Sequence, residues 1–132
     1  MVQDNYVIFV DDEEALHLLF KSALKRTARE KNFNIECFEN GLVCLNFLKE
    51  EASKINILLI VTDLNMPVMN GFELTEQVKK SFPGIHLVVS SAYGDKETAD
   101  VARSLGASGF LAKPLDIDLL IEEIDNAMNA PA

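Results

Sequence analysis

The chain is predicted to fold as a doubly wound α/β domain with a five-stranded parallel sheet and five helices. Short apolar runs typical of strands alternate along it with longer segments whose apolar residues recur at helical spacing. Its 132 residues, 48% hydrophobic and 25% charged, are enough for one core without disulfides or a structural metal. Strict β-α alternation requires right-handed crossovers, which place helices on both faces of a parallel sheet. We therefore expect one domain over residues 1–132, with its core at about 6–128.

The first half of the chain supplies three strands and two helices. Residues 6–10 form an apolar strand, 35–38 a short strand, and 57–62 a strand expected to be buried on both faces. Between the first two strands, one helix face is expected to contain Leu16, Leu19, Phe20, Ala23, Leu24 and Thr27. Residues 41–50 are predicted to form the second helix. Its inward residues are expected to be Leu42, Leu45 and Leu48.

The second half repeats the pattern. A loop leads into a helix over 71–81, and a strand follows at 86–90. Residues 95–105 are predicted to form a helix capped by Asp95, before a fifth strand at 109–112. The apolar stripe of the last helix consists of Ile117, Leu120, Ile121, Ile124 and Met128. This order predicts a flavodoxin-like sheet with strand order 2-1-3-4-5, in which ligands bind beyond the carboxyl ends of the strands.

Charged residues stand where three of these strands end. Asp11 and Asp12 follow the first strand, Asp63 follows the third, and Lys113 follows the fifth. Two like charges at roughly 4 Å repel by about 1 kcal/mol in water and about 4 kcal/mol at an effective dielectric constant near 20. A hard divalent cation with oxygen ligands is the usual reason for such a cluster, and a lysine adds a positive charge. The pattern indicates a site that handles a phosphoryl group.

Composition limits the other functions. A net charge of −9 without a basic patch disfavours nucleic-acid binding, and no apolar run is long enough for a membrane span. The N-terminus does not resemble a secretory signal, so a cytoplasmic location is expected. The basic residues within 21–31 are interpreted as a solvated helix face, as is His17. Cys37 and Cys44 lack metal-ligand spacing and are expected to be reduced core residues.

The strand-end residues resemble one family, the receiver domain of two-component response regulators, in its single-domain, CheY-like form. The matching features are the pair Asp11-Asp12, Asp63 within the run Asp-Leu-Asn-Met-Pro, Ser91-Ala92 after the fourth strand, and Lys113-Pro114 after the fifth. The resemblance extends from about Tyr6 to Met128. All four features occur in order, each at a predicted strand end, which makes the combined signal specific.

The resemblance implies that Asp63 accepts a phosphoryl group from a sensor histidine kinase or a histidine phosphotransfer protein. It implies Mg²⁺ as the cofactor, bound directly by Asp12, Asp63 and the backbone carbonyl of Asn65, with Asp11 acting through a water molecule. Apart from its own phosphorylation and dephosphorylation, such a domain is expected to catalyse no reaction.

Further roles follow from the same resemblance. Lys113 is expected to pair with a phosphoryl oxygen and to precede a cis peptide bond to Pro114. The Ser91 hydroxyl is expected to bind another phosphoryl oxygen, and Ala92, with Asn65, to line the cofactor and phosphoryl site. Movement of Ser91 and of the Phe110 ring is expected to switch the surface of the fourth helix, fifth strand and fifth helix. That surface is expected to bind a downstream protein, with the chain as a monomer or a weak phosphorylation-linked dimer.

Several alternatives remain open at this stage. The chain is either a single receiver or a receiver cut from a longer multidomain regulator, because Ala130-Pro131-Ala132 reads equally as a tail or the start of a linker. A different class, a metal-dependent aspartyl phosphohydrolase, usually needs Asp-x-Asp on its first strand, whereas this chain has the adjacent acids Asp11-Asp12-Glu13 there. A flavin-binding module would suffer repulsion between adjacent carboxylates and the flavin phosphate. Tyr93 is expected either to shield the acyl phosphate from water or to belong to a partner surface.

Overall fold

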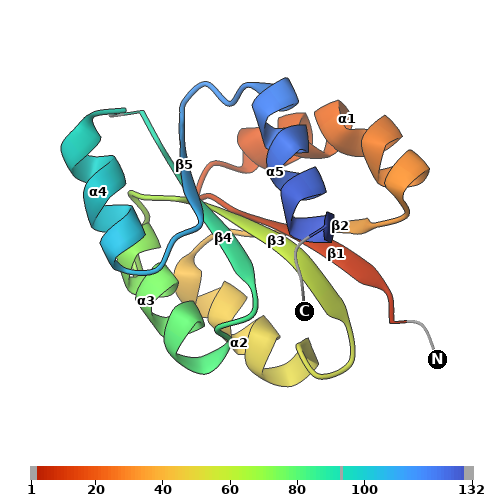
Figure 1. The fold of residues 1–132 in the computed structure, drawn as a ribbon, viewed down its shortest axis with the longest axis horizontal. Helices are drawn as coiled ribbons and strands as arrows, with labels where there is room; N and C mark the ends of the chain where they lie inside the picture. Colours follow the sequence, from red (N-terminus) through yellow and green to blue (C-terminus); the bar gives the residue numbers. More distant parts are fainter. Residues whose placement is uncertain (1–2, 93, 130–132) are drawn as a thin grey trace.

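The computed structural model describes residues 3–92 and 94–129, which form a sheet between two helical layers (Figure 1). The strands are β1 (Asn5–Val10), β2 (Asn34–Phe38), β3 (Asn56–Asp63), β4 (His86–Ser91) and β5 (Gly109–Ala112). The helices are α1 (Glu14–Lys31), α2 (Gly41–Glu51), α3 (Gly71–Ser81), α4 (Lys96–Ser104) and α5 (Ile117–Asn129). All strand pairs are parallel, in the order β2-β1-β3-β4-β5, which confirms the predicted fold class.

Side chains alternate across the sheet and divide the core into two clusters. Ile8 and Val10 face the layer of α2, α3 and α4, whereas Val7 and Phe9 face the layer of α1 and α5. The central strands are buried on both faces, as the apolar run at 57–62 predicts. A register shift between Tyr6 and Val7 in the β1–β3 pairing interrupts the alternation of β3. Because all the strand pairs are parallel, the carboxyl ends of the strands lie at one edge of the sheet.

Local sequence signals start four of the helices, including α5, where the Asp116 side chain accepts the Asp118 and Leu119 N–H groups. The Asn40 side chain accepts the Val43 N–H at the start of α2, and Asp95 accepts the Thr98 N–H at the start of α4. Asn70 and Glu73 form a capping box at the start of α3. In contrast, the side chain of Glu13, the N-cap residue of α1, makes no capping hydrogen bond.

Some predicted inward positions are wrong. Leu19 is 63% exposed and Leu42 is 41% exposed, while Cys44 is fully buried on α2. Ala23 is exposed, and Met128 is 39% exposed near the end of α5. Helical spacing predicts a broad apolar stripe, but each helix contacts the sheet through only the centre of that stripe. The margins are therefore covered only where a neighbouring helix reaches them.

Within the described ranges, no helix combines the length and apolar composition that crossing a bilayer requires.

Candidate phosphoryl-transfer site

The end of β1 places one buried and one exposed carboxylate. Asp11 is 0% exposed, and its N–H donates to the Phe38 carbonyl at 3.0 Å, which continues the β1–β2 pairing by one residue. Its Oδ1 accepts the Glu13 N–H at 2.9 Å. Asp12 is exposed at the mouth of the same edge. The turn into α1 therefore holds the first carboxylate rigidly and leaves the second accessible to solvent.

The end of β3 is fixed by its own backbone contacts. Asp63 is 8% exposed, and its carbonyl accepts a hydrogen bond from the Thr62 hydroxyl at 2.9 Å. The next residue, Leu64, donates its N–H to the Ser90 carbonyl at 3.0 Å and accepts the Gly71 N–H at 2.8 Å. A Cβ on Gly71 would lie 2.3 Å from the Asp63 carbonyl oxygen, so only glycine permits this approach. The start of α3 thus packs directly against the backbone of Asp63.

Lys113 joins the two strand ends. Its Nζ lies 2.7 Å from Asp11 Oδ2 and 3.0 Å from Asp63 Oδ1, with 18% of the side chain exposed. Its N–H donates to the Ser91 carbonyl at 2.9 Å, which extends the β4–β5 pairing beyond the strands. The Lys113–Pro114 bond is cis, as expected. A lysine from the fifth strand end therefore reaches carboxylates from the first and third.

The cluster perturbs the protonation of its members. Burial raises the pKa of the Asp63 carboxyl above its ordinary value, and the Lys113 ammonium only partly opposes this effect. Burial also disfavours the charged form of Lys113, but hydrogen bonds to Asp11 and Asp63 outweigh it and raise the pKa of this lysine. The lysine is therefore held charged, beside a carboxylate that is costly to ionise. Additional positive charge at this position would relieve that cost.

The oxygen atoms suit a hard cation. Carboxylate oxygens of Asp11, Asp12 and Asp63 all lie within 4.8 Å of one another. Oxygen-only donors and partial solvent exposure match the preference of Mg²⁺, which usually keeps several waters and takes one or two carboxylates. Asn65 is exposed two residues beyond Asp63, in the loop between β3 and α3. These residues can accommodate the cation that the sequence predicts.

The predicted switch residues lie on neighbouring strands: Ser91 is the last residue of β4, and Phe110 lies within β5. Val89 pairs with Phe110 and Ser91 with Ala112 in the strand register, so Ser91 and Phe110 are diagonal neighbours on one face. Ser91 is fully buried, and Phe110 is half-buried against the cluster of the α2, α3 and α4 layer. Ala92 is exposed at the strand end. The structure therefore brings every predicted site residue among those described to one edge of the sheet.

Three features of the site were missed or misinterpreted from sequence. His17 is half-buried rather than solvated: its Nε2 lies 2.6 Å from the Asp11 carbonyl oxygen, and its ring meets Phe9 edge-on. The Ser90 hydroxyl is fully buried without a hydrogen-bond partner in the described part of the chain. Cys37 is half-exposed and lines a polar cavity of about 400 Å³ beside Asp12. His17 follows Asp11 by six residues, and this spacing can be read from the sequence. The contact itself could not be predicted, because a backbone carbonyl is present at every residue and gives no sequence signal.

The expectation for Tyr93 concerns a position outside the described residues.

Comparisons with known proteins agree with this geometry. The family model described as "Response regulator receiver domain" matches residues 7–125. The chain is 31% identical to the transcriptional regulatory protein GlrR of Escherichia coli strain K12, over 96% of this chain and 27% of that protein. It is 28% identical to the chemotaxis protein CheY of Halobacterium salinarum, over 94% of this chain and 97% of that protein.

Among solved structures, the CheX-CheY-BeF3-Mg+2 complex from Borrelia burgdorferi matches with a TM-score of 0.81 and 20% identity. The match covers 98% of this chain and 92% of that chain. The chain thus spans about a quarter of one relative and nearly all of another. The family-model match over residues 7–125 favours the receiver interpretation over the phosphohydrolase and flavin-binding alternatives. From its fold, its strand-end residues and the family model, the chain belongs to the response regulator receiver domains of two-component systems.

Proposed function

We propose that this receiver accepts a phosphoryl group on Asp63 from the phosphohistidine of a sensor kinase or phosphotransfer protein. The observation that carries the proposal is the bridge from Lys113 Nζ to Asp11 at 2.7 Å and to Asp63 at 3.0 Å. This bridge places a cation beside the only one of these two carboxylates that is not completely buried. A phosphoryl group reaching that position meets a nucleophile and positive charge together.

The transfer forms one bond and breaks one. An Asp63 carboxylate oxygen attacks phosphorus while the bond from phosphorus to the donor imidazole nitrogen breaks, and that nitrogen retains the electron pair. The product is an acyl phosphate on Asp63 and a free histidine on the donor. Positioning and charge stabilisation supply most of the catalysis in phosphoryl transfer. Apart from this reaction and the later hydrolysis of the acyl phosphate, the receiver is proposed to catalyse nothing.

The proposal includes a Mg²⁺ site. Asp12, Asp63 and the Asn65 backbone carbonyl would hold the ion, with Asp11 acting through water. When bound, the ion neutralises charge on the phosphoryl oxygens. Asp11 serves mainly to hold the Lys113 ammonium, because its carboxylate is fully buried and already bonded to the Glu13 N–H. Lys113 then orients toward one phosphoryl oxygen, and Ser91, with the Ala92 backbone, toward another.

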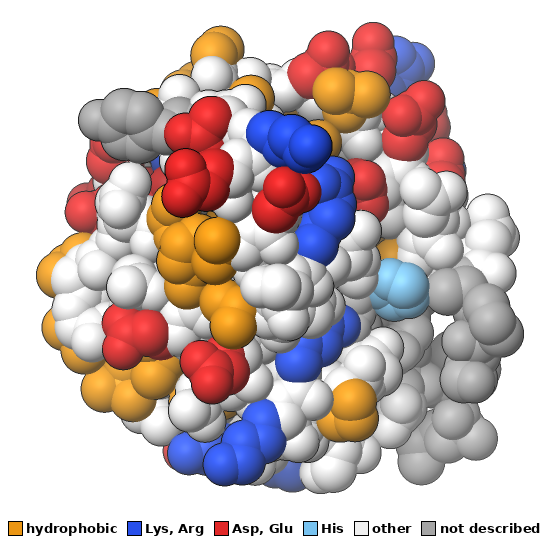
Figure 2. Space-filling view, turned by 60° about the vertical axis from the view of Figure 1, so that its left-hand side comes forward, with side chains coloured by type: hydrophobic (Ala, Val, Ile, Leu, Met, Phe, Trp, Pro, Cys, Tyr) orange, Lys and Arg blue, Asp and Glu red, His pale blue; other side chains and the backbone are white. Residues whose placement is uncertain are grey.

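The switch is proposed to run through β4 and β5. When the Ser91 hydroxyl turns toward the phosphoryl group, it leaves space for its diagonal neighbour Phe110, whose ring packs against the core cluster of the α2, α3 and α4 layer. Phe110 has no hydroxyl, so shape and packing rather than a ring hydrogen bond transmit the change. Figure 2 shows hydrophobic side chains between acidic ones on the α4 side of the molecule. We propose that this face, in the cytoplasm, binds the downstream protein.

Phosphorylation of variants tests the acceptor. Wild type incubated with acetyl phosphate and Mg²⁺ is expected to gain one phosphoryl group by intact mass, and the bond should be labile to hydroxylamine. Asp63→Asn is expected to gain none, whereas Asp100→Asn, a change at an exposed aspartate of α4, should be labelled like wild type. Equal labelling of Asp63→Asn would refute the assignment.

A thermal melt tests the metal assignment. Mg²⁺ binding to the folded state alone should raise the melting temperature of wild type through mass action. The shift should be lost in Asp12→Asn and retained in Asp100→Asn. An equal shift in all three proteins would show that the ion acts elsewhere.

Amide chemical shifts test the switch. Lys113→Ala is expected to accept the phosphoryl mimic beryllofluoride, because Asp63 and the proposed metal ligands remain. Shift changes near Phe110 should nevertheless be smaller than in wild type, since the variant loses the link between the acceptor and the end of β5. Changes of wild-type size would count against this coupling.

A further inference from the structure

The hydroxyl of Ser90, the residue before the predicted switch serine, is buried without a use in the unphosphorylated protein. Ser90 is 0% exposed, and its Oγ has no hydrogen-bond partner among the residues that the structure describes. A buried hydroxyl in this situation is unfavourable, because the hydrogen bonds that it loses to water are not replaced. By contrast, the buried hydroxyls of Thr62 and Thr75 donate to backbone carbonyls at 2.9 and 2.7 Å. The Ser90 hydroxyl is therefore a donor that is available for a new bond.

The strand register places Ser90 beside the acceptor. Ser90 pairs with Asp63 on β3 and with Leu111 on β5. Register partners in a parallel sheet point to the same face, and neighbouring strands lie about 4.8 Å apart. Leu111 belongs to the cluster of the α1 and α5 layer, so the side chains of Ser90 and Asp63 also face that layer. At this spacing, rotation of the Ser90 side chain between staggered rotamers can bring its Oγ within hydrogen-bond distance of the Asp63 side chain.

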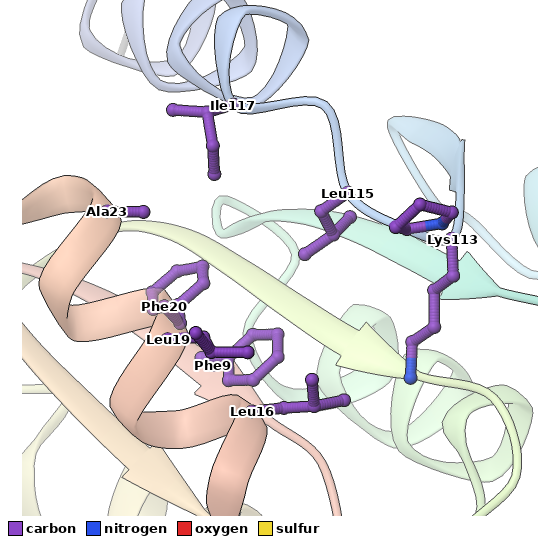
Figure 3. Close-up of a pocket in the computed structure, with 9 residues that line it drawn as sticks. Phe9, Leu16, Leu19, Phe20, Ala23, Lys113, Leu115 and Ile117 are labelled. Atoms are coloured by element: carbon purple, nitrogen blue, oxygen red, sulfur yellow. The ribbon is translucent and has the colours of Figure 1, made fainter.

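The backbone around Ser90 is fixed, so its hydroxyl is the part that can move. The Ser90 carbonyl accepts the Leu64 N–H at 3.0 Å, and the Ser91 carbonyl accepts the Lys113 N–H at 2.9 Å. Because β4 lies between β3 and β5, the Lys113 side chain crosses the end of β4 to reach Asp63 Oδ1 at 3.0 Å. Figure 3 shows this side chain running toward the tip of β3. Ser90 therefore lies in the same row as Asp63, one row below Lys113.

We propose that Ser90 is a positioning residue whose hydroxyl donates to the carbonyl oxygen of Asp63 once the phosphoryl group is attached, an inference that rests on the proposed role of Asp63 as acceptor. After transfer, Asp63 has one oxygen bonded to phosphorus and one carbonyl oxygen. Lys113 then pairs with a phosphoryl oxygen and no longer with the carboxylate. The Asp63 carbonyl oxygen has lost the ammonium as its partner, and the Ser90 hydroxyl is a buried donor on the adjacent strand.

This hydrogen bond stabilises only the phosphorylated state. In the unphosphorylated protein the Ser90 hydroxyl is buried without a partner in the described ranges, so it does not favour that state. Bonding to the Asp63 carbonyl oxygen satisfies both groups in the phosphorylated state. Ser90 thereby differs from Ser91, which lies on the opposite face with Phe110 and is proposed to contact a phosphoryl oxygen. The two consecutive serines hold the acyl group and the phosphoryl group, respectively.

Equilibrium binding of beryllofluoride tests the proposal. Ser90→Ala should bind this phosphoryl mimic about tenfold more weakly than wild type, because it cannot form the new hydrogen bond. Ser90→Thr and Ser90→Val form a matched pair, since the two side chains have nearly the same shape and only threonine keeps the hydroxyl. Ser90→Thr should bind about tenfold more tightly than Ser90→Val. Amide chemical shifts, followed during titration with beryllium in excess fluoride at fixed Mg²⁺, give the affinities.

Thermal stability without beryllofluoride gives a second readout. Ser90→Ala should raise the melting temperature, because it removes a buried hydroxyl that has no partner in this state. Thr75→Val is the control, since it removes a buried hydroxyl that donates to the Gly71 carbonyl. It should lower the melting temperature and leave the affinity for beryllofluoride unchanged. A purely structural role for Ser90 would instead make Ser90→Ala behave like Thr75→Val.

Two outcomes would overturn this inference and leave the acceptor assignment intact. One is wild-type affinity for beryllofluoride in Ser90→Ala, with equal affinities in the threonine and valine variants. The other is a lower melting temperature in Ser90→Ala, because the hydroxyl would then already be bonded in the unphosphorylated protein. A wild type that does not bind beryllofluoride would overturn the proposed function, and this inference with it.

Discussion

The two helical layers cover the sheet to different extents. On the side of α2, α3 and α4, the helix starts are capped or packed closely, and Gly71 lies against the Asp63 carbonyl. On the side of α1 and α5, a groove of about 250 Å³ remains, and Leu18 and Leu19 are largely exposed. The closely packed layer contacts the acceptor and Phe110, whereas the grooved layer borders Lys113. The backbone of Asp63, which positions the acceptor, therefore lies against the closely packed layer. The layer of α1 and α5 instead leaves apolar side chains uncovered, where a partner protein can dock.

A large effect is expected at Gly71, where the layer of α2, α3 and α4 packs against the acceptor. Gly71→Ala should lower the free energy of unfolding by about 3 kcal/mol, because the added Cβ meets the backbone of Asp63 and neither can move easily. This loss should appear although alanine is the better helix former. Gly84→Ala is the control, since a Cβ there has nothing within 4 Å. Urea unfolding followed by circular dichroism measures the stability of both variants. Similar small losses would show that the backbone around Asp63 shifts easily to accommodate the added Cβ.

Leucine truncations compare the two layers directly. Leu48→Ala on α2 and Leu24→Ala on α1 each remove a fully buried side chain, so each should cost about 2–5 kcal/mol of stability. Leu19→Ala should cost less than about 1 kcal/mol in the monomer, because that side chain is 63% exposed. Urea unfolding at high salt gives the three values. A large loss for Leu19→Ala would mean that the groove residue belongs to the core.

The Asp63 carboxylate at the end of β3 should make the stability of the protein depend on pH. Burial raises the pKa of Asp63 in the folded state, so its stabilising contribution is full when it is protonated and is lost as pH rises through that pKa. Without Mg²⁺ at neutral pH, Asp63→Asn should therefore be more stable than wild type by about 1 kcal/mol. The difference should narrow as pH falls toward the ordinary value of 3.8. A difference that is constant with pH would contradict this.

The smallest expected effect is a difference in thiol reactivity between Cys37 and Cys44. Burial raises the pKa of Cys44 to about 12, and it also raises the pKa of the half-exposed Cys37. In the native protein iodoacetamide is expected to modify Cys37 slowly and Cys44 not at all, while both react in urea. Peptide mass spectrometry measures the two sites. Native modification of Cys44 would show that the α2 layer opens readily.

Much of the fold could be predicted because its signals are local. The boundaries of α3 and β5 agree with the expected 71–81 and 109–112, since capping residues, a proline-glycine stop and apolar runs mark them. The inward faces were predicted less well. Leu19 and Leu42 satisfy helical spacing, yet they are exposed because their burial depends on whether a neighbouring helix covers them. Cys37 was expected in the core; its side chain packs against the core cluster of the α1 and α5 layer but is only partly buried, and it also lines a polar cavity.

By itself, the sequence determined that Asp11, Asp12, Asp63 and Lys113 gather at one edge, because strand ends in a parallel sheet converge once the β-α order is set. Tertiary structure alone decided which carboxylate is buried, that Lys113 bridges Asp11 and Asp63, and that His17 contacts a backbone carbonyl. It also decided that α1 and α5 leave a groove. Periodicity and residue type describe a segment and its neighbours along the chain, whereas burial, ion pairing and surface cover depend on segments brought together only by folding.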